Sequence, residues 1–488
     1  MTHLIPPEVS RVTDSLQNAG FEAYLVGGCV RDMLRNAKPK DWDVTTNAKP
    51  EQIEGLFDHT FYENTYGTVS VVNEDTDDET LKVIEVTPYR LESEYTDNRR
   101  PDTVEFSDSL EDDLQRRDFT INAIAYDPQK DTFVDPYQGQ KDIKDKTLRT
   151  VGDPKDRFNE DALRIMRAVR IHAELGFSIE ETTKKGIMDF KGALKDIARE
   201  RIRDEFTRII ASPNPAEALA VSRETGILDI IIPELTESYG VDQNQAHSFD
   251  VWTHLIKSVQ HAADKEYSLT VRFAALFHDI GKPATKRWDN KKSDCSFHGH
   301  EVVGAKITRK ILQRLCFSKE FISRVTTMVR WHMFFSDPEQ ITLSAVRRLI
   351  SNIGKENIQE IVNLRICDRI GTGRPKERPY RLRKYQSMIE EAMRDPVSVK
   401  SLAVDGNVLL SDLNMAPGPK IGYILHALLE EVLDDPTRNT KEHLLERAKD
   451  LLELTEEDLK KLGEKGKEKV EEEDEKALEE IRKKYWVK

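Results

Sequence analysis

The spacing of hydrophobic residues along the chain changes near residue 158. Before this position, short apolar and β-branched runs at 24–26, 68–72 and 82–86 alternate with amphipathic stretches. Such runs predict strands, and their mixture with helical stretches predicts an α/β unit. Beyond it, apolar residues recur at helical spacing almost throughout, as in 163–171. We therefore expect a multidomain protein with an N-terminal α/β unit built on a mixed sheet, followed by all-α units.

Breaks in this pattern divide the chain into five expected domains. Pro213 and Pro215 interrupt the helical pattern, and a basic, proline-containing stretch begins at Gly373. Residues of this kind mark turns and loops. The tail is rich in Glu and Lys, which predicts a solvated helix. The expected domains are an α/β head at 1–150, a helical neck at 151–212, a helical body at 213–395, a small helical unit at 396–452 and a charged helical tail at 453–488.

Length and composition narrow the class of protein. The chain has 488 residues, of which 33% are charged. It has no run of the roughly 20 apolar residues needed to span a bilayer, so no membrane partner is expected. Its N-terminal segment lacks the pattern of a signal peptide, and its four cysteines form no C-x-x-C pair. A cytoplasmic protein without disulfides or a zinc ribbon is therefore expected.

The net charge of −14 does not by itself indicate a nucleic-acid partner. Phosphate contacts are local, however, so the distribution of cations matters more than their sum. Basic residues are concentrated at 157–170, 199–208 and 374–384. Charge alone leaves RNA binding open.

A pair of glycines and two spaced acidic residues form the first chemical motif. Gly27 and Gly28 follow a predicted strand, where the absence of a Cβ lets the backbone approach a triphosphate. Asp41 and Asp43 would point to one face of the next strand. Two carboxylates placed in this way can bridge two Mg²⁺ ions, which clamp the attacking and leaving oxygens of a nucleotidyl transfer. Glu85, on another predicted strand, is expected to be the third catalytic carboxylate.

With this motif the chain resembles the family of class II tRNA nucleotidyltransferases and bacterial poly(A) polymerases. The resemblance continues through 116–123, which looks like the ribose-reading motif, and 157–164, which matches the base-selecting E-D-x-x-R motif. It implies a head of the polymerase β type that carries out Mg²⁺-dependent nucleotidyl transfer. By resemblance, the nucleotide-binding residues are Gly27, Gly28, Arg31, Arg117, Asp118, Asn122, Arg157, Asp161, Arg164 and Arg167.

The base-selecting motif has a simple physical interpretation. Asp161 and Arg164 are three positions apart, so on one helix they would share a face. One acceptor and one donor fork can together pair with the edge of a nucleobase, as a template strand would. By resemblance these two residues select C and then A, and Arg157 assists them.

Further likenesses concern the RNA substrate. Segment 200–205 is similar to the tRNA-type neck motif, and 405–422 resembles the C-terminal unit of tRNA-type members. Segment 87–101 resembles the flexible loop of enzymes that add the final A. A strongly basic C-terminal extension, as in bacterial poly(A) polymerases, is absent from this sequence. The resemblance therefore implies addition of CCA to the 3′ acceptor end of tRNA from CTP and ATP, without an obligate protein partner. Poly(A) synthesis and addition of A alone are alternatives.

A second set of metal-ligand residues lies in the helical body. His278 and Asp279 end an apolar helical stretch, where buried groups of this kind normally bind a metal or each other. The pattern resembles the HD phosphohydrolase superfamily, in which His, His-Asp and a distant Asp bind a divalent cation. Imidazole with carboxylate favours a transition metal such as Mn²⁺, Ni²⁺ or Fe²⁺. By resemblance the ligands are His254, His278, Asp279 and Asp368, with His300 and His332 as further metal or phosphate ligands.

The metal-ligand residues of the body also allow alternative functions for the protein. An accessory phosphatase or 2′,3′-cyclic phosphodiesterase activity would repair damaged tRNA ends before extension. A different class of function is an HD phosphohydrolase whose head only senses nucleotides. A non-catalytic RNA-binding protein is disfavoured by two complete sets of metal-ligand residues.

Overall fold

A computed structural model describes residues 5–62, 67–92, 104–245, 247–290, 293–333, 341–394 and 399–487. Most of the segment compared above with a flexible loop, 93–101, therefore lies outside the described residues. The chain forms two compact units, residues 1–332 with 363–375, and residues 333–362 with 376–488. Among the described helices, none has the length and apolar character that a membrane span requires. The five domain boundaries given above stay a prediction.

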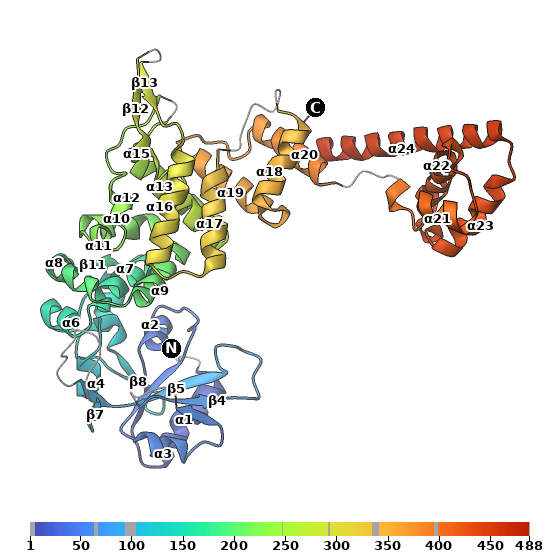
Figure 1. The fold of residues 1–488 in the computed structure, drawn as a ribbon. Coiled ribbons are helices and arrows are strands. Elements are labelled where there is room, and N and C mark those ends of the chain that lie inside the picture. The colour runs from blue at the N-terminus through green and yellow to red at the C-terminus, as the bar shows by residue number, and fades with distance from the viewer. Residues whose placement is uncertain are drawn as a thin grey trace. The chain divides into compact units, whose positions relative to one another are not determined.

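A seven-stranded mixed sheet forms the head of the first unit (Figure 1). Its strand order is β3-β4-β5-β2-β1-β8-β9, in which β2 and β5 are parallel and every other neighbouring pair is antiparallel. The predicted mixed sheet is confirmed. The strands are β1 (Ala23–Val26), β2 (Asp43–Thr46), β3 (Thr60–Tyr62), β4 (Val69–Val72), β5 (Val83–Pro88), β8 (Ala125–Asp127) and β9 (Thr132–Val134).

Burial alternates along β5 in the way its sequence predicts. Ile84 and Val86 are buried, whereas Val83 and Glu85 point to the other face of the sheet. A period of two places the apolar side chains in the core and the acidic side chain on the opposite face of the sheet. Short helices complete the head: α1 (Pro7–Asn18), α2 (Gly28–Leu34), α3 (Pro50–Glu54), α4 (Leu110–Gln115) and α5 (Gly139–Lys144).

The rest of the first unit is mostly helical, as predicted, with two small two-stranded sheets. Side chains of Asp250, Ser268 and Ser318 accept hydrogen bonds from the first turns of α13, α14 and α17, so the sequence itself marks where these helices begin. The neck helices are α6 (Pro154–Glu160), α7 (Leu163–Leu175), α8 (Glu181–Phe190), α9 (Arg199–Ala211), α10 (Pro215–Glu224), α11 (Leu228–Ile231) and α12 (Pro233–Thr236). The body contains α13 (Val251–Asp264), α14 (Leu269–Phe277), α15 (Lys282–Thr285), α16 (His300–Arg314), α17 (Lys319–Trp331) and α19 (Ile358–Gly371).

The second unit ends in a long helix, α24, that is not simply solvated. Leu459 is buried, and a Cβ on Gly466 would lie 2.3 Å from the carbonyl oxygen of His426 in α22. The glycine therefore permits a close approach of the two helices, and one face of the tail is packed. The helices are α18 (Leu343–Ile353), α20 (Tyr380–Met393), α21 (Gly406–Asp412), α22 (Pro419–Asp434), α23 (Lys441–Leu452) and α24 (Glu456–Lys484).

Two glycine-to-alanine changes in this unit are expected to have opposite effects. In Gly466→Ala the added Cβ meets backbone that cannot yield, so overpacking should destabilise the unit by about 1–3 kcal/mol. In Gly422→Ala nothing lies within 4 Å of the added Cβ. Alanine in an open helical position should stabilise the unit by about 0.5–1 kcal/mol. Thermal unfolding of the two variants checks both signs, and equal shifts would contradict the close packing of α24.

Candidate active site and metal cluster

Three carboxylates converge at the centre of the sheet. Asp43 begins β2 and is the Cα partner of Glu85 on β5. Neighbouring strands lie about 4.8 Å apart, so these two side chains are adjacent on one face. Asp41 lies two residues before β2 rather than within it, and it lines the same cavity. The predicted trio is thus brought together by one parallel pair of strands.

The electrostatics of Asp43 show how close the three groups are. Burial raises the pKa of Asp43 to about 7, and the negative charges of Asp41 and Glu85 contribute to the increase. A group in this setting is stabilised by any cation that enters. Gly27, at φ +75°, leaves the necessary room: a Cβ there would lie 3.2 Å from Asp43 Oδ2 and 3.3 Å from Arg117 Nη1. No other residue type fits this position without displacing the carboxylate.

A cavity of about 560 Å³ extends from the carboxylates toward the neck. Its polar lining is dominated by nine arginines against six acidic residues, of which three are the converging carboxylates. The remaining excess of positive charge suits a triphosphate and an RNA backbone. The charged residues are Arg31, Arg90, Arg116, Arg117, Arg164, Arg167, Arg170, Arg201, Arg208, Asp41, Asp43, Glu85, Asp118, Asp161 and Glu174.

Hydrogen bonds connect the carboxylate end of this cavity to its neck end. Arg31 Nη1 donates to Asn122 Oδ1 at 3.0 Å, and Asn122 Nδ2 donates to Asp118 Oδ1 at 3.2 Å. Arg167 donates to Asp118 Oδ2 from Nε at 2.8 Å, with Nη2 at 2.6 Å. Burial alone would raise the pKa of Asp118, but Arg167 and Arg164 hold it well below its ordinary value. Asp118 is therefore an ionised acceptor in a fixed orientation.

Asp113 supports this arrangement from behind. It is fully buried, and its Oδ2 accepts hydrogen bonds from Arg117 Nη2 at 2.9 Å and Thr45 Oγ1 at 3.2 Å. Arg116 donates to the other oxygen. The sequence analysis did not single out Asp113, because a carboxylate in a short acidic helix gives no sign that it will be buried.

The ion pairs of Asp113 with Arg116 and Arg117 predict a loss of folding stability in acid. Burial alone would raise the pKa of Asp113, but Arg116 and Arg117 lower it to about 2. A depressed folded-state pKa stabilises the protein above the unfolded value, and this contribution is lost as the pH falls through the folded value. The contribution of ionised Asp113 to the free energy of unfolding should be about 2 kcal/mol, and it should be lost between about pH 4 and pH 2. In Asp113→Asn the unfolding temperature should be lowered at pH 7, and the difference from wild type should shrink over this window. Asp58→Asn, at an exposed position, should show no such change.

Asp161 and Arg164, the residues predicted to select the base, do not lie on one helix, so this part of the sequence prediction was wrong. Helix α6 ends at Glu160, Asp161 has extended backbone angles (φ −144°, ψ 104°), and α7 begins at Leu163. The reason is local, because Asp161 Oδ1 accepts a hydrogen bond from Leu163 N at 2.9 Å and competes with helix continuation. Asp161 and Arg164 nevertheless both line the cavity.

Asp161 and Arg164 each contact other protein groups in this structure. Asp161 Oδ2 lies 3.1 Å from Arg201 Nη2 of α9. Arg164 donates to Glu160 Oε2 at 2.5 Å and to the carbonyl oxygen of Arg116 at 2.9 Å. Both side chains are thereby held at the cavity wall.

Arg157 is not among the residues that line the cavity. Its Nη1 donates to the Gln115 carbonyl oxygen at 2.7 Å, and its Nη2 lies 2.5 Å from Glu160 Oε1. It therefore positions Glu160. Conversely, Arg170, Glu174, Arg201 and Arg208 line the cavity without having been predicted to touch the nucleotide. In the sequence, only their helical spacing along α7 and α9 could have indicated that these residues face the same side as the predicted ones.

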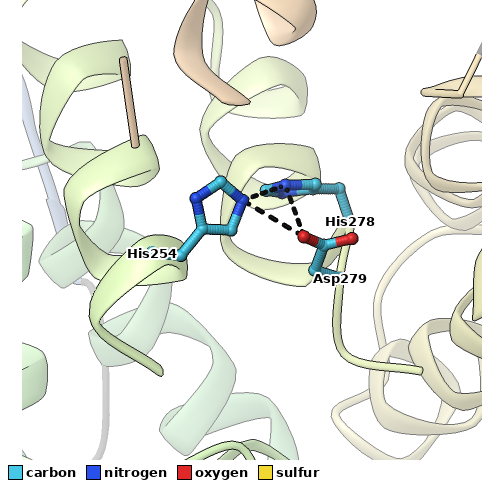
Figure 2. A group of neighbouring side chains, drawn as sticks. All are labelled: His254, His278 and Asp279. Atoms are coloured by element: carbon cyan, nitrogen blue, oxygen red, sulfur yellow. Dashed lines mark hydrogen bonds and ion pairs between the residues drawn. The ribbon is translucent and has the colours of Figure 1, made fainter. Parts of the chain in front are cut away.

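A buried cluster of histidines and carboxylates lies in the body (Figure 2). His254 Nε2 lies 2.8 Å from His278 Nε2 and 3.1 Å from Asp279 Oδ2. On the other side of the same carboxylate, Asp279 Oδ1 lies 3.2 Å from His300 Nε2 and 3.5 Å from His332 Nε2. Asp279 is thus shared by two groups of three ligands.

Asp368, on α19, belongs to the first group. Its Oδ1 lies 3.5 Å from His254 Nε2 and 3.8 Å from His278 Nε2, and Arg365 donates to its Oδ2. The structure thereby brings together all six residues predicted for this site.

Hydrogen bonds to the backbone determine which ring nitrogens face the centre of the cluster. The Nδ1 atoms of His278, His300 and His332 lie 2.9, 2.7 and 2.7 Å from the carbonyl oxygens of Ala275, Phe297 and Val329. Each Nδ1 must donate, so a neutral ring directs its unprotonated Nε2 inward. His300 Nε2 and His332 Nε2 lie only 3.3 Å apart. Lone pairs that face each other across this distance require a cation between them.

The charge of the cluster leads to the same conclusion. Burial would lower the pKa of His278, but Asp279 and Asp368 raise it to about 10. A positive charge is therefore favoured where the imidazoles meet, and a divalent ion fits the donor set better than a proton does.

Three family models match successive parts of the chain. Residues 23–149 match the "Poly A polymerase head domain". Residues 176–239 match the "Probable RNA and SrmB- binding site of polymerase A", and residues 245–370 match the "HD domain". The three matches follow the order of head, neck and body.

Curated relatives and solved structures extend this similarity to most of the chain. A "CCA-adding enzyme" of Geobacillus thermodenitrificans is 34% identical over 445 residues, which cover 89% of this chain and 95% of that protein. An "A-adding tRNA nucleotidyltransferase" of Deinococcus radiodurans is 31% identical, covering 84% of this chain and 91% of that protein. The crystal structure of a Bacillus stearothermophilus CCA-adding enzyme in complex with CTP has a TM-score of 0.59 and 26% identity, and the match covers 91% of this chain and 98% of that one.

Proposed function

This chain belongs to the family of CCA-adding enzymes and A-adding tRNA nucleotidyltransferases, and from that premise we propose that it adds C, C and A in turn to the 3′ end of tRNA. The nucleotides come from CTP and ATP, without a template strand. The single observation that carries this proposal is the convergence of Asp41, Asp43 and Glu85 beside Gly27 in an arginine-lined cavity.

The carboxylates would hold divalent ions, which the family requires for nucleotidyl transfer. We assign Mg²⁺, because three carboxylates offer only hard oxygen ligands. When bound, such ions supply positive charge at the attacking and leaving oxygens. The 3′ oxygen of tRNA bonds to the α-phosphorus as the bond from this phosphorus to the pyrophosphate oxygen breaks. The proton of the 3′ hydroxyl leaves to solvent.

The remaining cavity residues bind and orient the nucleotide. Gly27 and Gly28 let the backbone approach the triphosphate, where Arg31 and Arg117 supply positive charge. Asp118, held ionised, accepts from a ribose hydroxyl, with Asn122 and Arg167 fixing its direction. Asp161 and Arg164 would turn from Arg201 and Glu160 toward the base edge and pair with C or A.

Stepwise nucleotide supply tests this proposal. With tRNA that lacks CCA, CTP alone should extend the end by two residues, and ATP should then add a single residue. ATP alone should extend only tRNA that already ends in CC. Failure of CTP incorporation with normal A addition would favour an A-adding enzyme, and a long A tail would favour a poly(A) polymerase. No incorporation of either nucleotide would favour a hydrolase with a nucleotide-sensing head.

We also propose a hydrolytic function for the cluster in the body. The facing Nε2 atoms of His300 and His332, and of His254 and His278, favour one or two transition-metal ions such as Mn²⁺ or Ni²⁺. We propose phosphatase or 2′,3′-cyclic phosphodiesterase activity. Water adds to the phosphorus and one ester P–O bond breaks. The released oxygen takes up the proton that the water loses. A second hydrolysis would free the 3′ hydroxyl that nucleotidyl transfer needs.

The expected location is the cytoplasm, as predicted from the sequence, and it fits a tRNA substrate. It stays part of this proposal.

A further inference from the structure

A short hairpin projects from the body beside α15 (Figure 1). It consists of β12 (Arg287–Asp289) and β13 (Asp294–Ser296), and Trp288 is the Cα partner of Cys295. In the chain it is inserted between the metal-ligand residues Asp279 and His300. Its two strands form a sheet of their own.

Residues that precede and follow the hairpin contact the histidine–aspartate cluster. Before it, Lys282 of α15 is buried and its Nζ lies 2.6 Å from Asp279 Oδ2. At its end, the carbonyl oxygen of Phe297 accepts from Nδ1 of His300 at 2.7 Å. Lys282 Nζ also lies 5.5 Å from the centre of the Phe297 ring. The hairpin is therefore fixed relative to the ligands.

The hairpin presents an aromatic ring and positive charge to solvent. Trp288 is 64% exposed, and the neighbouring Lys286 and Arg287 are also exposed. Neither cation forms an ion pair with any residue that the structure describes. A tryptophan with most of its surface exposed stabilises a hairpin little by burial, whereas it is well suited to stack on a nucleobase next to cations that bind phosphate.

The end of the hairpin and one ligand ring lie between Trp288 and the centre of the cluster. Cys295, opposite Trp288, is two residues from Phe297, which corresponds to about 7 Å of extended strand. The His300 ring then separates Phe297 from the centre of the cluster. A ligand that reaches from Trp288 to the cluster must span this segment, and a strand of several nucleotides is long enough to do so.

We propose that the hairpin binds a base near the 3′ end of a single-stranded RNA, so that the cluster acts on the end of an oligoribonucleotide rather than on a free mononucleotide. This inference rests on the hydrolytic function proposed above and names its substrate class. Lys286 and Arg287 bind the backbone phosphates between the stacked base and the scissile phosphate.

Two substrates and two substitutions test the proposal in the full-length, metal-loaded protein. With an oligoribonucleotide that ends in a 2′,3′-cyclic phosphate, Trp288→Ala should raise KM by about 10-fold, the size of one lost base–aromatic stack. Trp288→Phe should retain most of the affinity, because it keeps a ring. With 2′,3′-cyclic AMP both variants should match the wild type. An unchanged KM for the oligoribonucleotide, or equal losses on both substrates, overturns the proposal.

A binding measurement separates this proposal from the hydrolytic one. An oligoribonucleotide with a single 4-thiouridine a few nucleotides upstream of its 3′ end should cross-link to the hairpin on irradiation, with the adduct in the peptide that contains Trp288. The cross-link should be lost in Trp288→Ala even if the wild type hydrolyses neither substrate, in which case only the hydrolytic function fails. If the cross-linked peptides do not include the hairpin, the proposed role of the hairpin is wrong. It is also wrong if the hairpin binds a protein and not RNA.

Discussion

Replacement of Asp43 by asparagine is expected to reduce the incorporation of CTP and ATP into tRNA by roughly 10³-fold or more, which corresponds to several kcal/mol of transition-state stabilisation. Asparagine preserves the size of the side chain but removes the charge that faces Glu85 across the parallel pair β2–β5. Single-turnover incorporation at saturating nucleotide measures the effect directly.

The same substitution should not weaken the fold. Burial and two neighbouring carboxylates raise the pKa of Asp43 to about 7, so in metal-free protein its charge is unfavourable. Asp43→Asn should therefore unfold at the same temperature as the wild type or a higher one. Asp58→Asn serves as the control for transfer activity, because that residue lies on the exposed surface of the same head. Near-normal incorporation by Asp43→Asn would end the interpretation of the head as a polymerase site.

Replacement of Asp279 by asparagine is the second change with a large expected effect. Both groups of three ligands use this carboxylate, so the substitution should remove bound transition metal almost completely. It should also reduce phosphoester hydrolysis by roughly 100-fold or more. CCA addition should stay near the wild-type rate, because the head contains its own ligands. Elemental analysis of the purified protein and hydrolysis of 2′,3′-cyclic AMP are the measurements.

Removal of the metal gives an independent readout. A chelator should lower the unfolding temperature of the wild type, since four imidazoles and two carboxylates would be left buried without their cation. Asp279→Asn should be insensitive to the chelator. His298→Ala is a matched control, because this exposed histidine lies two residues before His300. Metal content that survives in Asp279→Asn, or falls equally in His298→Ala, would contradict the assignment of the cluster.

Much of the nucleotidyl-transfer site was predictable because its residues lie in continuous motifs. Gly27 and Gly28, the pair Asp41 and Asp43, and the motif around Asp118 each carry a local signal of strand, turn or charge. The adjacency of Asp43 and Glu85 followed from the alternation of side chains along strands. The pairing of Asp118 with Arg167, in contrast, joins residues 49 positions apart, and no local pattern specifies such a contact.

The largest misjudgements arose where side chains compete with secondary structure or pack at a distance. Asp161 binds the backbone N–H of Leu163 and so ends the helix that periodicity predicted. Arg157 bonds to Gln115 and Glu160 instead of reaching the cavity. Helix α24 has the charge pattern of a solvated helix, yet Gly463 and Gly466 let it pack closely on α22.

The sequence by itself determined the order of the parts and which residues could form each site, because strand alternation, glycine turns and histidine–aspartate pairs are local properties of the chain. Only the tertiary structure decided which groups share a carboxylate, which arginines enter the cavity and which ring nitrogens face inward. These features depend on distances between elements that are far apart in the chain. Burial then sets their energies, since charges removed from water are stable only beside specific partners.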